Sequence, residues 1–225
     1  MVPHLHDPRS GVLRRRRSDR KSDTFCRYGA EGFGTHVTAH VYTVGGNKQA
    51  IDAGVRSIEH GNLIDEEIAQ MMVENGMWLS PQVLVYRAFS ADLRPARPEK
   101  GRLVEAGLGD MFSLAKECGI KSVFGTDVVV NPRACADQNK EFAARLDWVT
   151  PAKILTRATA NSGEVLQLSG YRSPYPGVVG RIVEGAHADL LLTNGNSVED
   201  FTILEDYDAA IAFIMKAGVI NRENM

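Results

Sequence analysis

The sequence of 225 residues contains little cysteine, no apolar run long enough to cross a membrane and no apolar leader. Its three cysteines, Cys26, Cys118 and Cys135, are widely spaced and form no CxxC pattern, so we expect reduced structural thiols. The first residues lack the apolar core of a signal peptide, and no window approaches the length of a transmembrane span. These absences predict a cytoplasmic protein with no membrane partner.

The overall charge gives no indication of a nucleic-acid partner. With a net charge of −2, 44% hydrophobic and 24% charged residues, the composition is that of an ordinary soluble globular protein of one large or two small domains. This total implies no nucleic-acid partner. Six of the eight residues at positions 14–21 (RRRRSDRK) are basic, and such a run is typical of a solvated, disordered tail. Nuclear targeting and polyanion binding are the alternative interpretations of that run.

Regular patterns of apolar residues begin near residue 35 and indicate strands that alternate with helices. Strands are predicted over residues 36–42, 55–61, 77–86 and 121–127, and helices over 48–54, 63–76, 99–118, 137–147 and 150–168. This alternation is the signature of parallel βα units in an α/β fold. After residue 170, apolar strand candidates without long helices between them predict a small β-rich module. We therefore divide the chain into a basic tail (1–30), a βα region (31–171) and a β module (172–225).

Three of the four predicted βα strands end on a residue that can bind a metal ion, namely His40, His60 and Asp127. In a βα barrel the C-terminal ends of the strands and the loops after them build the active site, so residues far apart in the sequence converge there. Two neutral imidazoles and a carboxylate suit a divalent ion such as zinc, and an open position on that ion could hold a reactive water. For each histidine the alternative is a side chain that only packs within its strand.

The ordered motifs VTAHVYT, AIDAGVRSIEHGNLID, FGTD, PAKILTRATANSGEVL and GRIVEGAHADLLL resemble the C-terminal half of the metal-dependent amidohydrolase superfamily, near its imidazolonepropionase-like and prolidase-like dipeptidase branch. The resemblance implies a distorted (β/α)8 barrel, similar to a TIM barrel, that carries one or two divalent ions beside a small β-sandwich. It implies that His40 and His60 are metal ligands and that Asp127 is both a ligand and the proton acceptor. Tyr42, two residues beyond His40, corresponds to a position that contacts the substrate in related dipeptidases.

Two parts of the family pattern are missing from the sequence. The family opens with His-x-His at the end of its first strand and places a carboxylated lysine or a glutamate on its fourth. The HLH at positions 4–6 has the right letters, but only three residues precede it and no strand can deliver it. Residues 36–168 hold about four βα units at about 30 residues each. We therefore expect a partial barrel of about strands five to eight, with a C-terminal portion of the sandwich, from a truncated chain.

The resemblance implies hydrolysis of an amide, peptide or cyclic C–N bond in a small-molecule or dipeptide-like substrate. A bound zinc ion lowers the pKa of its water from 15.7 to about 7. Asp127 would then take a proton from that water, and His60 would help to polarise the scissile carbonyl. With at most three ligands left, we expect reduced or no activity from this chain alone. The alternatives are a non-catalytic half-barrel that associates, for example as a homo-oligomer, and a polyanion-binding protein that uses residues 14–21.

Other polar residues have a plain structural interpretation. His36 lies about 13 Å from His40 along its strand at about 3.3 Å per residue, and His187 belongs to the β module, so we expect neither to share the ion. Ser80 and Gln82 lie near the end of the third predicted strand. A substrate contact and a polar entry into a loop are equally consistent with that position.

Overall fold

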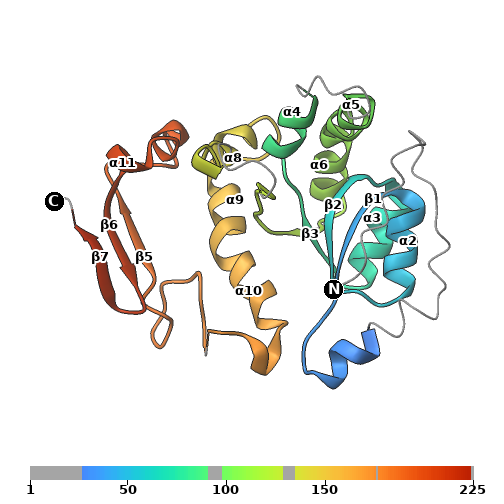
Figure 1. Ribbon diagram of the computed structural model, residues 1–225, viewed down its shortest axis with the longest axis horizontal. Coiled ribbons are helices and arrows are strands. Elements are labelled where there is room, and N and C mark those ends of the chain that lie inside the picture. The colour runs from blue at the N-terminus through green and yellow to red at the C-terminus, as the bar shows by residue number, and fades with distance from the viewer. Residues whose placement is uncertain (1–26, 91–97, 129–134, 176, 224–225) are drawn as a thin grey trace.

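The computed structural model describes residues 27–90, 98–128, 135–175 and 177–223, so the basic run at 14–21 lies outside the described residues. The described chain contains two β-sheets, one of four strands and one of three (Figure 1). Within the described residues, no helix is both long enough and apolar enough to cross a membrane.

The larger sheet has four parallel strands in the order β1-β2-β3-β4. Its strands are β1 (Thr38–Thr43), β2 (Ser57–Leu63), β3 (Trp78–Ser80) and β4 (Lys121–Ser122). Since every neighbouring pair is parallel, each strand is followed by a crossover that returns the chain to the same end of the sheet. The C-terminal ends of all four strands therefore lie side by side, as the sequence predicts for βα units.

Helices form the crossovers between these strands (Figure 1). Helix α3 begins after Asp65, whose carboxylate accepts a hydrogen bond from the backbone N–H of Ile68 at 2.9 Å. Its buried residues Ile68, Ala69 and Met72 share one face, which is the amphipathic pattern of a helix packed on a core. The helices of this region are α2 (Val44–Asp52), α3 (Glu66–Glu74), α4 (Leu84–Ser90), α5 (Pro98–Ala106), α6 (Leu108–Glu117) and α8 (Lys140–Ala144).

The main apolar core lies between the parallel sheet and its helices. Ile58 of β2, Leu79 of β3 and Met111 of α6 are completely buried in it. Full burial of one such side chain contributes about 1.5–3 kcal/mol to folding. All three residues of β3 are buried, as expected for an inner strand of a parallel sheet that is covered on both faces.

The strand predicted over residues 77–86 is wrong in its second half, because β3 ends at Ser80 and helix α4 follows it. Pro81 has no N–H group to donate to a strand ladder. The Glu141 carboxylate accepts hydrogen bonds from the N–H of Val83 and of the residue after it, which satisfies the free donors at the start of α4. A partner distant in the sequence therefore decides the structure of an apolar run that fits either a strand or a helix.

The helix predicted over residues 99–118 is two helices, α5 and α6, that meet at Gly107. A Cβ atom at Gly107 would lie 2.4 Å from the backbone carbonyl oxygen of Asn62 at the end of β2. The close approach of these two backbones therefore requires a glycine at the junction.

The strand predicted over residues 121–127 is shorter than expected. Only Lys121–Ser122 forms β4, although the N–H of Val123 still donates to the carbonyl oxygen of Leu79 at 2.9 Å. The chain beyond it runs to Asp127 without regular structure, so the end of this segment behaves as a loop.

The helix predicted over residues 150–168 is present and contains a π-helical turn. Helix α9 (Pro151–Thr156) continues into the π-helix η1 (Arg157–Asn161) and then into α10 (Ser162–Gln167). Nδ2 of Asn161 donates to the carbonyl oxygen of Ser122 at 2.7 Å, which ties the π-helix to β4. Turns of this kind are rare, and they occur frequently at functional sites.

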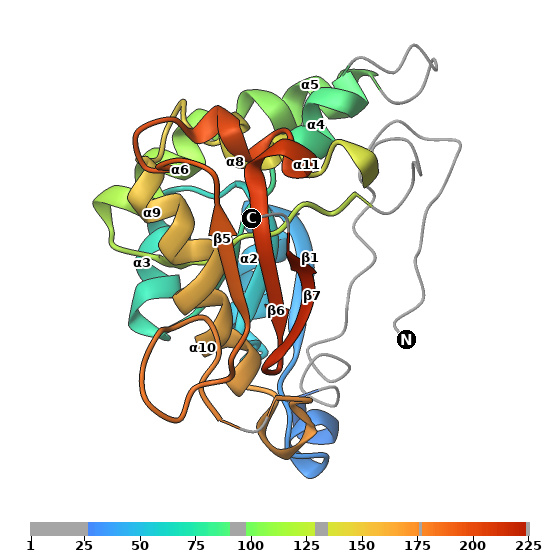
Figure 2. The same cartoon turned by 90° about the vertical axis from the view of Figure 1, so that its left-hand side faces the viewer.

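The region predicted as a β-rich module contains one antiparallel sheet in the order β5-β6-β7. Figures 1 and 2 show this sheet on the far side of α9 and α10 from the parallel sheet. Residues 177–223 contain no second sheet to face it, so the β-sandwich stays a prediction. Its elements are β5 (Leu190–Thr193), the 3-10 helix η3 (Phe201–Leu204), α11 (Tyr207–Ala210), β6 (Ile211–Lys216) and β7 (Val219–Glu223).

Candidate active site

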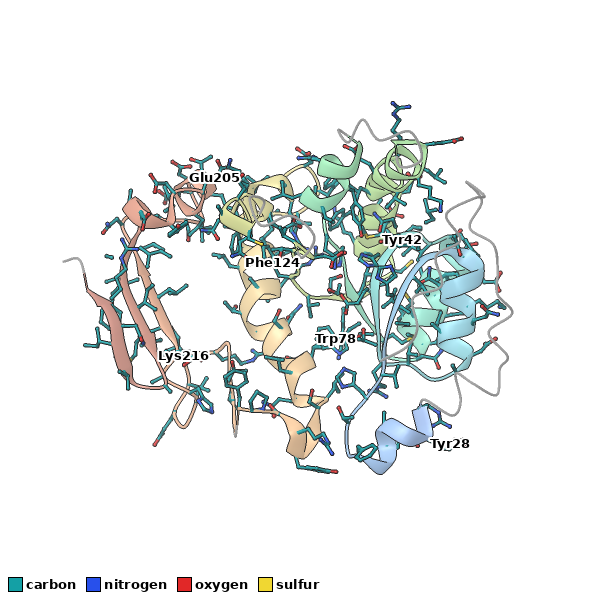
Figure 3. All side chains as sticks on the ribbon, in the orientation of Figure 1. Tyr28, Tyr42, Trp78, Phe124, Glu205 and Lys216 are labelled. Atoms are coloured by element: carbon teal, nitrogen blue, oxygen red, sulfur yellow. The ribbon has the colours of Figure 1, made fainter. Side chains whose placement is uncertain are left out.

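The candidate active site lies at the C-terminal end of the parallel strands, on β1 and β2. Nδ1 of His40 and Nε2 of His60 face one another at 2.6 Å. The ring of Tyr42 stacks on His60 with 4.5 Å between the ring centroids and meets His40 edge-on at 5.1 Å. Figure 3 shows Tyr42 near the opposite end of the sheet from Trp78, the first residue of β3. Three of the predicted site residues are therefore in direct contact.

The backbone is strained at two of the predicted site residues. His60 has φ of 79° and Asp127 has φ of 52°, whereas the one other non-glycine residue with positive φ in the described ranges is Ala217. This left-handed region is uncommon for residues with a Cβ atom, and such conformations persist where the surrounding structure enforces them. At His60 this conformation lies within β2, which continues to Leu63.

Hydrogen bonds fix the orientation of the His60 ring. Its Nδ1 lies 2.7 Å from Oε1 of Gln82 and 2.5 Å from the hydroxyl of Tyr86. Nε2 of Gln82 donates to the carbonyl oxygen of Ser80 at 2.7 Å, so the oxygen of the Gln82 amide faces the imidazole. Because an amide oxygen can only accept, Nδ1 of His60 carries the proton and Nε2 presents its lone pair towards His40.

Burial sets the protonation of His60 and Tyr42. Desolvation and the neighbouring His40 lower the pKa of His60 to about 4, so its imidazole is neutral at pH 7. Desolvation, followed by the charge of Asp127, raises the pKa of Tyr42 to about 12, so its phenol keeps its proton. At neutral pH the site therefore offers the lone pair of the neutral His60 imidazole and, as a hydrogen-bond donor, the hydroxyl of Tyr42.

The carboxylate of Asp127 interacts electrostatically with this group. It raises the pKa of both Tyr42 and Tyr86, and His40 in turn opposes the rise in the pKa of Asp127. The largest influence on Asp127 is burial, which raises the pKa of its carboxyl. Asp127 is therefore a stronger base than a fully hydrated aspartate.

The donor atoms suit a divalent ion, whereas their arrangement is not a complete metal site. Two imidazole nitrogens and a carboxylate oxygen are ordinary ligand types for zinc. The hydrogen bond from Nδ1 of His60 to Gln82 is the outer contact that metal-bound histidines usually make. Among the residues that the structure describes, however, no group of three or more His, Cys, Asp or Glu side chains is arranged to hold a metal ion.

A buried ion pair holds the loops that flank the site. The guanidinium of Arg145 donates to a Glu141 oxygen at 2.8 Å, and both side chains are fully buried. Arg145 also donates to the carbonyl oxygens of Pro81, Val123 and Gly125, at 2.5, 3.3 and 2.8 Å. One side chain thus connects the loop that carries Gln82 with the segment that leads to Asp127.

Sequence reasoning left Gln82 as either a substrate contact or a polar entry into a loop, and it missed Tyr86 altogether. Both touch His60, and both are buried. Gln82 lies in the loop before α4 and Tyr86 lies within α4, whereas the sequence predicts one strand over both positions. The relevant signal was Pro81, which ends that strand just before Gln82.

The two histidines that we expected to be structural lie away from the pair. Nδ1 of His36 is buried and has no hydrogen-bond partner among the residues that the structure describes. His187 lies 5.8 Å from Tyr175, between ring centroids, next to the C-terminal sheet.

Comparison with known proteins identifies the family. The sequence pattern of the amidohydrolase family matches residues 26–222. Ochratoxinase from Aspergillus niger is 26% identical over 186 residues, which are 81% of this chain and 37% of that protein.

Solved structures agree with this match. The crystal structure of an amidohydrolase has 32% identity and a TM-score of 0.81, with 91% of this chain and 48% of that chain covered. A prolidase complexed with N-methylphosphonate-L-proline has 28% identity and a TM-score of 0.81, with coverages of 91% and 49%. The present chain thus spans about half the length of these two proteins and 37% of the ochratoxinase. The chain belongs to the amidohydrolase family.

Proposed function

We propose that the protein is a metal-dependent hydrolase of amide or peptide C–N bonds, with His40, His60 and Asp127 as its metal-binding residues. The single observation that carries this proposal is the pair of imidazole nitrogens, from neighbouring parallel strands, that face one another at 2.6 Å. The strained backbone of His60 and the hydrogen bond that fixes its ring support a functional role for that pair.

The proposal includes the architecture around the site. The four parallel βα units would be about strands five to eight of a (β/α)8 barrel, and the C-terminal sheet would be part of a β-sandwich. Coverage of about half of the related amidohydrolase and prolidase chains, at TM-scores of 0.81, supports this interpretation. The site would then lie at the C-terminal ends of the barrel strands, where barrel enzymes carry their chemistry.

When bound, a zinc or similar ion would supply a water that ionises near neutral pH and would polarise the scissile carbonyl. The chain's own residues have separate tasks beside it. His60 stays neutral, which keeps the lone pair of Nε2 available for coordination. The carboxylate of Asp127 accepts a proton from the attacking water and delivers it to the leaving nitrogen, and its raised pKa favours the first of these transfers.

For the substrate we propose an amide or a dipeptide, in keeping with the ochratoxinase, prolidase and Xaa-Pro dipeptidase among the similar proteins. Tyr42 is the proposed contact. Its phenol keeps its proton at neutral pH, so it can donate a hydrogen bond to a carbonyl or carboxylate oxygen of the substrate.

A non-catalytic half-barrel that associates is the second candidate. The observation that favours it is that β1 and β4 each pair with one strand only within the described sheet, which leaves both outer edges able to pair. Self-association of the purified chain, as a homo-oligomer, without metal uptake or hydrolysis would support this candidate over the enzyme.

Zinc uptake separates the two candidates. The purified chain is dialysed against zinc and then against buffer, and the retained metal is measured by atomic spectrometry. We expect His40→Ala and His60→Ala to lose the bound zinc, while the matched control His187→Ala retains it. A folded wild-type chain that retains no zinc would overturn the metal-dependent proposal.

Hydrolysis is tested with an Xaa-Pro dipeptide and the zinc-loaded chain. Asp127→Asn keeps the shape of the side chain but removes the proton acceptor, so we expect the loss of turnover. Turnover by Asp127→Asn equal to that of the wild type would contradict the assigned role of Asp127.

A further inference from the structure

A surface pocket of about 320 Å³ lies between α6, β4 and the start of the α9–η1 helix, away from the histidine pair. Aromatic and aliphatic side chains line part of it. The rings of Phe112 and Trp148 are stacked there at 5.0 Å with an interplanar angle of 9°, and Ile120 is buried beside them. Because Phe112 is only 3% exposed, the half-buried Trp148 provides the apolar surface of this ring pair that a ligand can reach.

Four cationic side chains line the same pocket, and no aspartate or glutamate of the described ranges does. Of the ion pairs within the described residues, none includes any of the four. Two of them lie against aromatic rings, and the other two extend from α6 and α9. The four cations are Lys116, Lys121, Lys153 and Arg157.

Arg157 has a buried donor that nothing in the described structure satisfies. Its Nη1 atom is buried without a hydrogen-bond partner. Burial, and then the charge of Arg145, lower the pKa of its guanidinium to about 10, so it remains charged at neutral pH. An unsatisfied buried donor on a charged group costs more than one on a neutral group. An anion near the Arg157 guanidinium would therefore offset the repulsion between the like charges of Arg157 and Arg145.

The pocket lies at the other end of the sheet from the candidate active site. Lys121 is the first residue of β4, pairs in register with Trp78 and places its Nζ atom 5.1 Å from the centre of that ring. Figure 3 shows Trp78 near the opposite end of the sheet from Tyr42, which stacks on His60. A ligand in this pocket would not compete with a substrate at the histidine pair.

We propose that this pocket binds a small organic anion, one that joins an aromatic or other apolar body to a phosphate, sulfonate or carboxylate group. The apolar body would lie against Trp148, and the acidic group would pair with Lys121, Lys153 and Arg157. The combination argues against two simpler ligand classes: a neutral aromatic compound would leave the four charges unpaired, and an inorganic anion would leave the exposed part of Trp148 uncovered.

The test is calorimetric titration of the full chain with phenyl phosphate, phenol and inorganic phosphate in a chloride buffer. Phenyl phosphate should bind saturably, should alter Trp148 fluorescence, and should lose that fluorescence signal in Trp148→Phe. Inorganic phosphate should bind at least about tenfold more weakly, because it buries no apolar surface. Equal binding of phenol and phenyl phosphate, equal binding of inorganic phosphate and phenyl phosphate, or no saturable binding would each overturn the proposal.

Charge-removing variants locate the binding. Lys121→Gln with Lys153→Gln alters two exposed side chains and should weaken phenyl phosphate binding by at least about tenfold, as expected when charged hydrogen bonds are lost. Lys48→Gln, an exposed lysine on α2 outside the pocket, is the matched control and should bind like the wild type. Arg157→Gln should also weaken binding. Wild-type affinity in the folded double variant would overturn the assignment, whatever the outcome of the zinc experiment.

Discussion

The two sheets of this protein use similar residues in different surroundings. Leu79 in β3 and Leu191 in β5 both occupy apolar strands, yet Leu79 is fully buried and Leu191 is 66% exposed. Helices cover the parallel sheet, and every residue of the main core cluster except Phe201 comes from residues 50–154. The comparison shows that an apolar strand pattern predicts a strand, whereas burial depends on whether another element covers it.

The exposed strand β5 has a physical consequence. A three-stranded sheet needs a packed face to be stable, and contiguous exposed apolar area marks an interaction surface. All three leucines of β5 are exposed. We therefore expect the parallel sheet to determine the global stability of the chain and the C-terminal sheet to contribute little.

The largest expected effect is on the buried ion pair of the parallel-sheet region. Glu141→Gln leaves Arg145 buried without its counter-charge and weakens the contacts to the start of α4, so unfolding should become easier by about 3–5 kcal/mol. Urea denaturation followed by circular dichroism measures the change. Glu67→Gln removes one partner of an exposed pair with Lys48 and should lower the free energy of unfolding far less than Glu141→Gln, because water screens exposed charges. Equal losses in the two variants would contradict the importance of the buried pair.

The next largest expected effect is a difference in the free energy of unfolding between alanine variants of Leu79 and Leu191. Leu79→Ala should lower the free energy of unfolding by about 2–5 kcal/mol, because it leaves a cavity between strand and helices. Leu191→Ala should change it by less than about 0.5 kcal/mol, since the side chain is mostly in water. Both values come from the same urea titration. A large loss from Leu191→Ala would show that β5 is covered in solution by a partner or a second copy.

The smallest effect is a pH dependence confined to the C-terminal sheet. Asp189 accepts hydrogen bonds from Lys216 at 2.5 Å and from the N–H of Ala217 at 2.7 Å, and these lower the pKa of its carboxyl. A lowered folded-state pKa stabilises the hairpin above the unfolded value of about 3.9. That stabilisation is lost as the pH falls through the folded value.

Amide hydrogen exchange at Ala217 measures this local effect. Its protection factor should decrease on acidification below about pH 4, while amides of β2 and β3 keep theirs. In Asp189→Asn the protection at Ala217 should no longer depend on pH in this range. A decrease of the same size in that variant would exclude the carboxylate as the cause.

The sequence predicted the alternation of strands and helices because local periodicity and turn residues encode it. It failed where a distant partner decides the structure. The run after Ser80 becomes a helix since Glu141, about 60 positions later, caps it. The break at Gly107 follows from the approach of Asn62, and such contacts leave no periodic signal in the sequence.

In the candidate site, too, part of the arrangement was predicted from the sequence and part was not. The contact of His40 with His60 was predicted from strand ends alone, since parallel neighbours bring those ends together. The hydrogen bonds of Gln82 and Tyr86 with His60 were not predicted, because they depend on where β3 ends. The left-handed conformation of Asp127 was also beyond sequence reasoning, because nothing in the residue type requires it.

The π-helix at Arg157–Asn161 has a consequence for the rest of the chain. A π-turn amounts to one extra residue within an α-helix, so deleting one residue there would rotate everything after it by about 100° around the helix axis. Glu164, just beyond the turn, pairs with Arg181 at 2.5 Å on the segment that leads to the C-terminal sheet. The inserted residue therefore sets the rotation of α10 about its axis. That rotation fixes the direction of Glu164, and with it the path by which the chain leaves the parallel sheet.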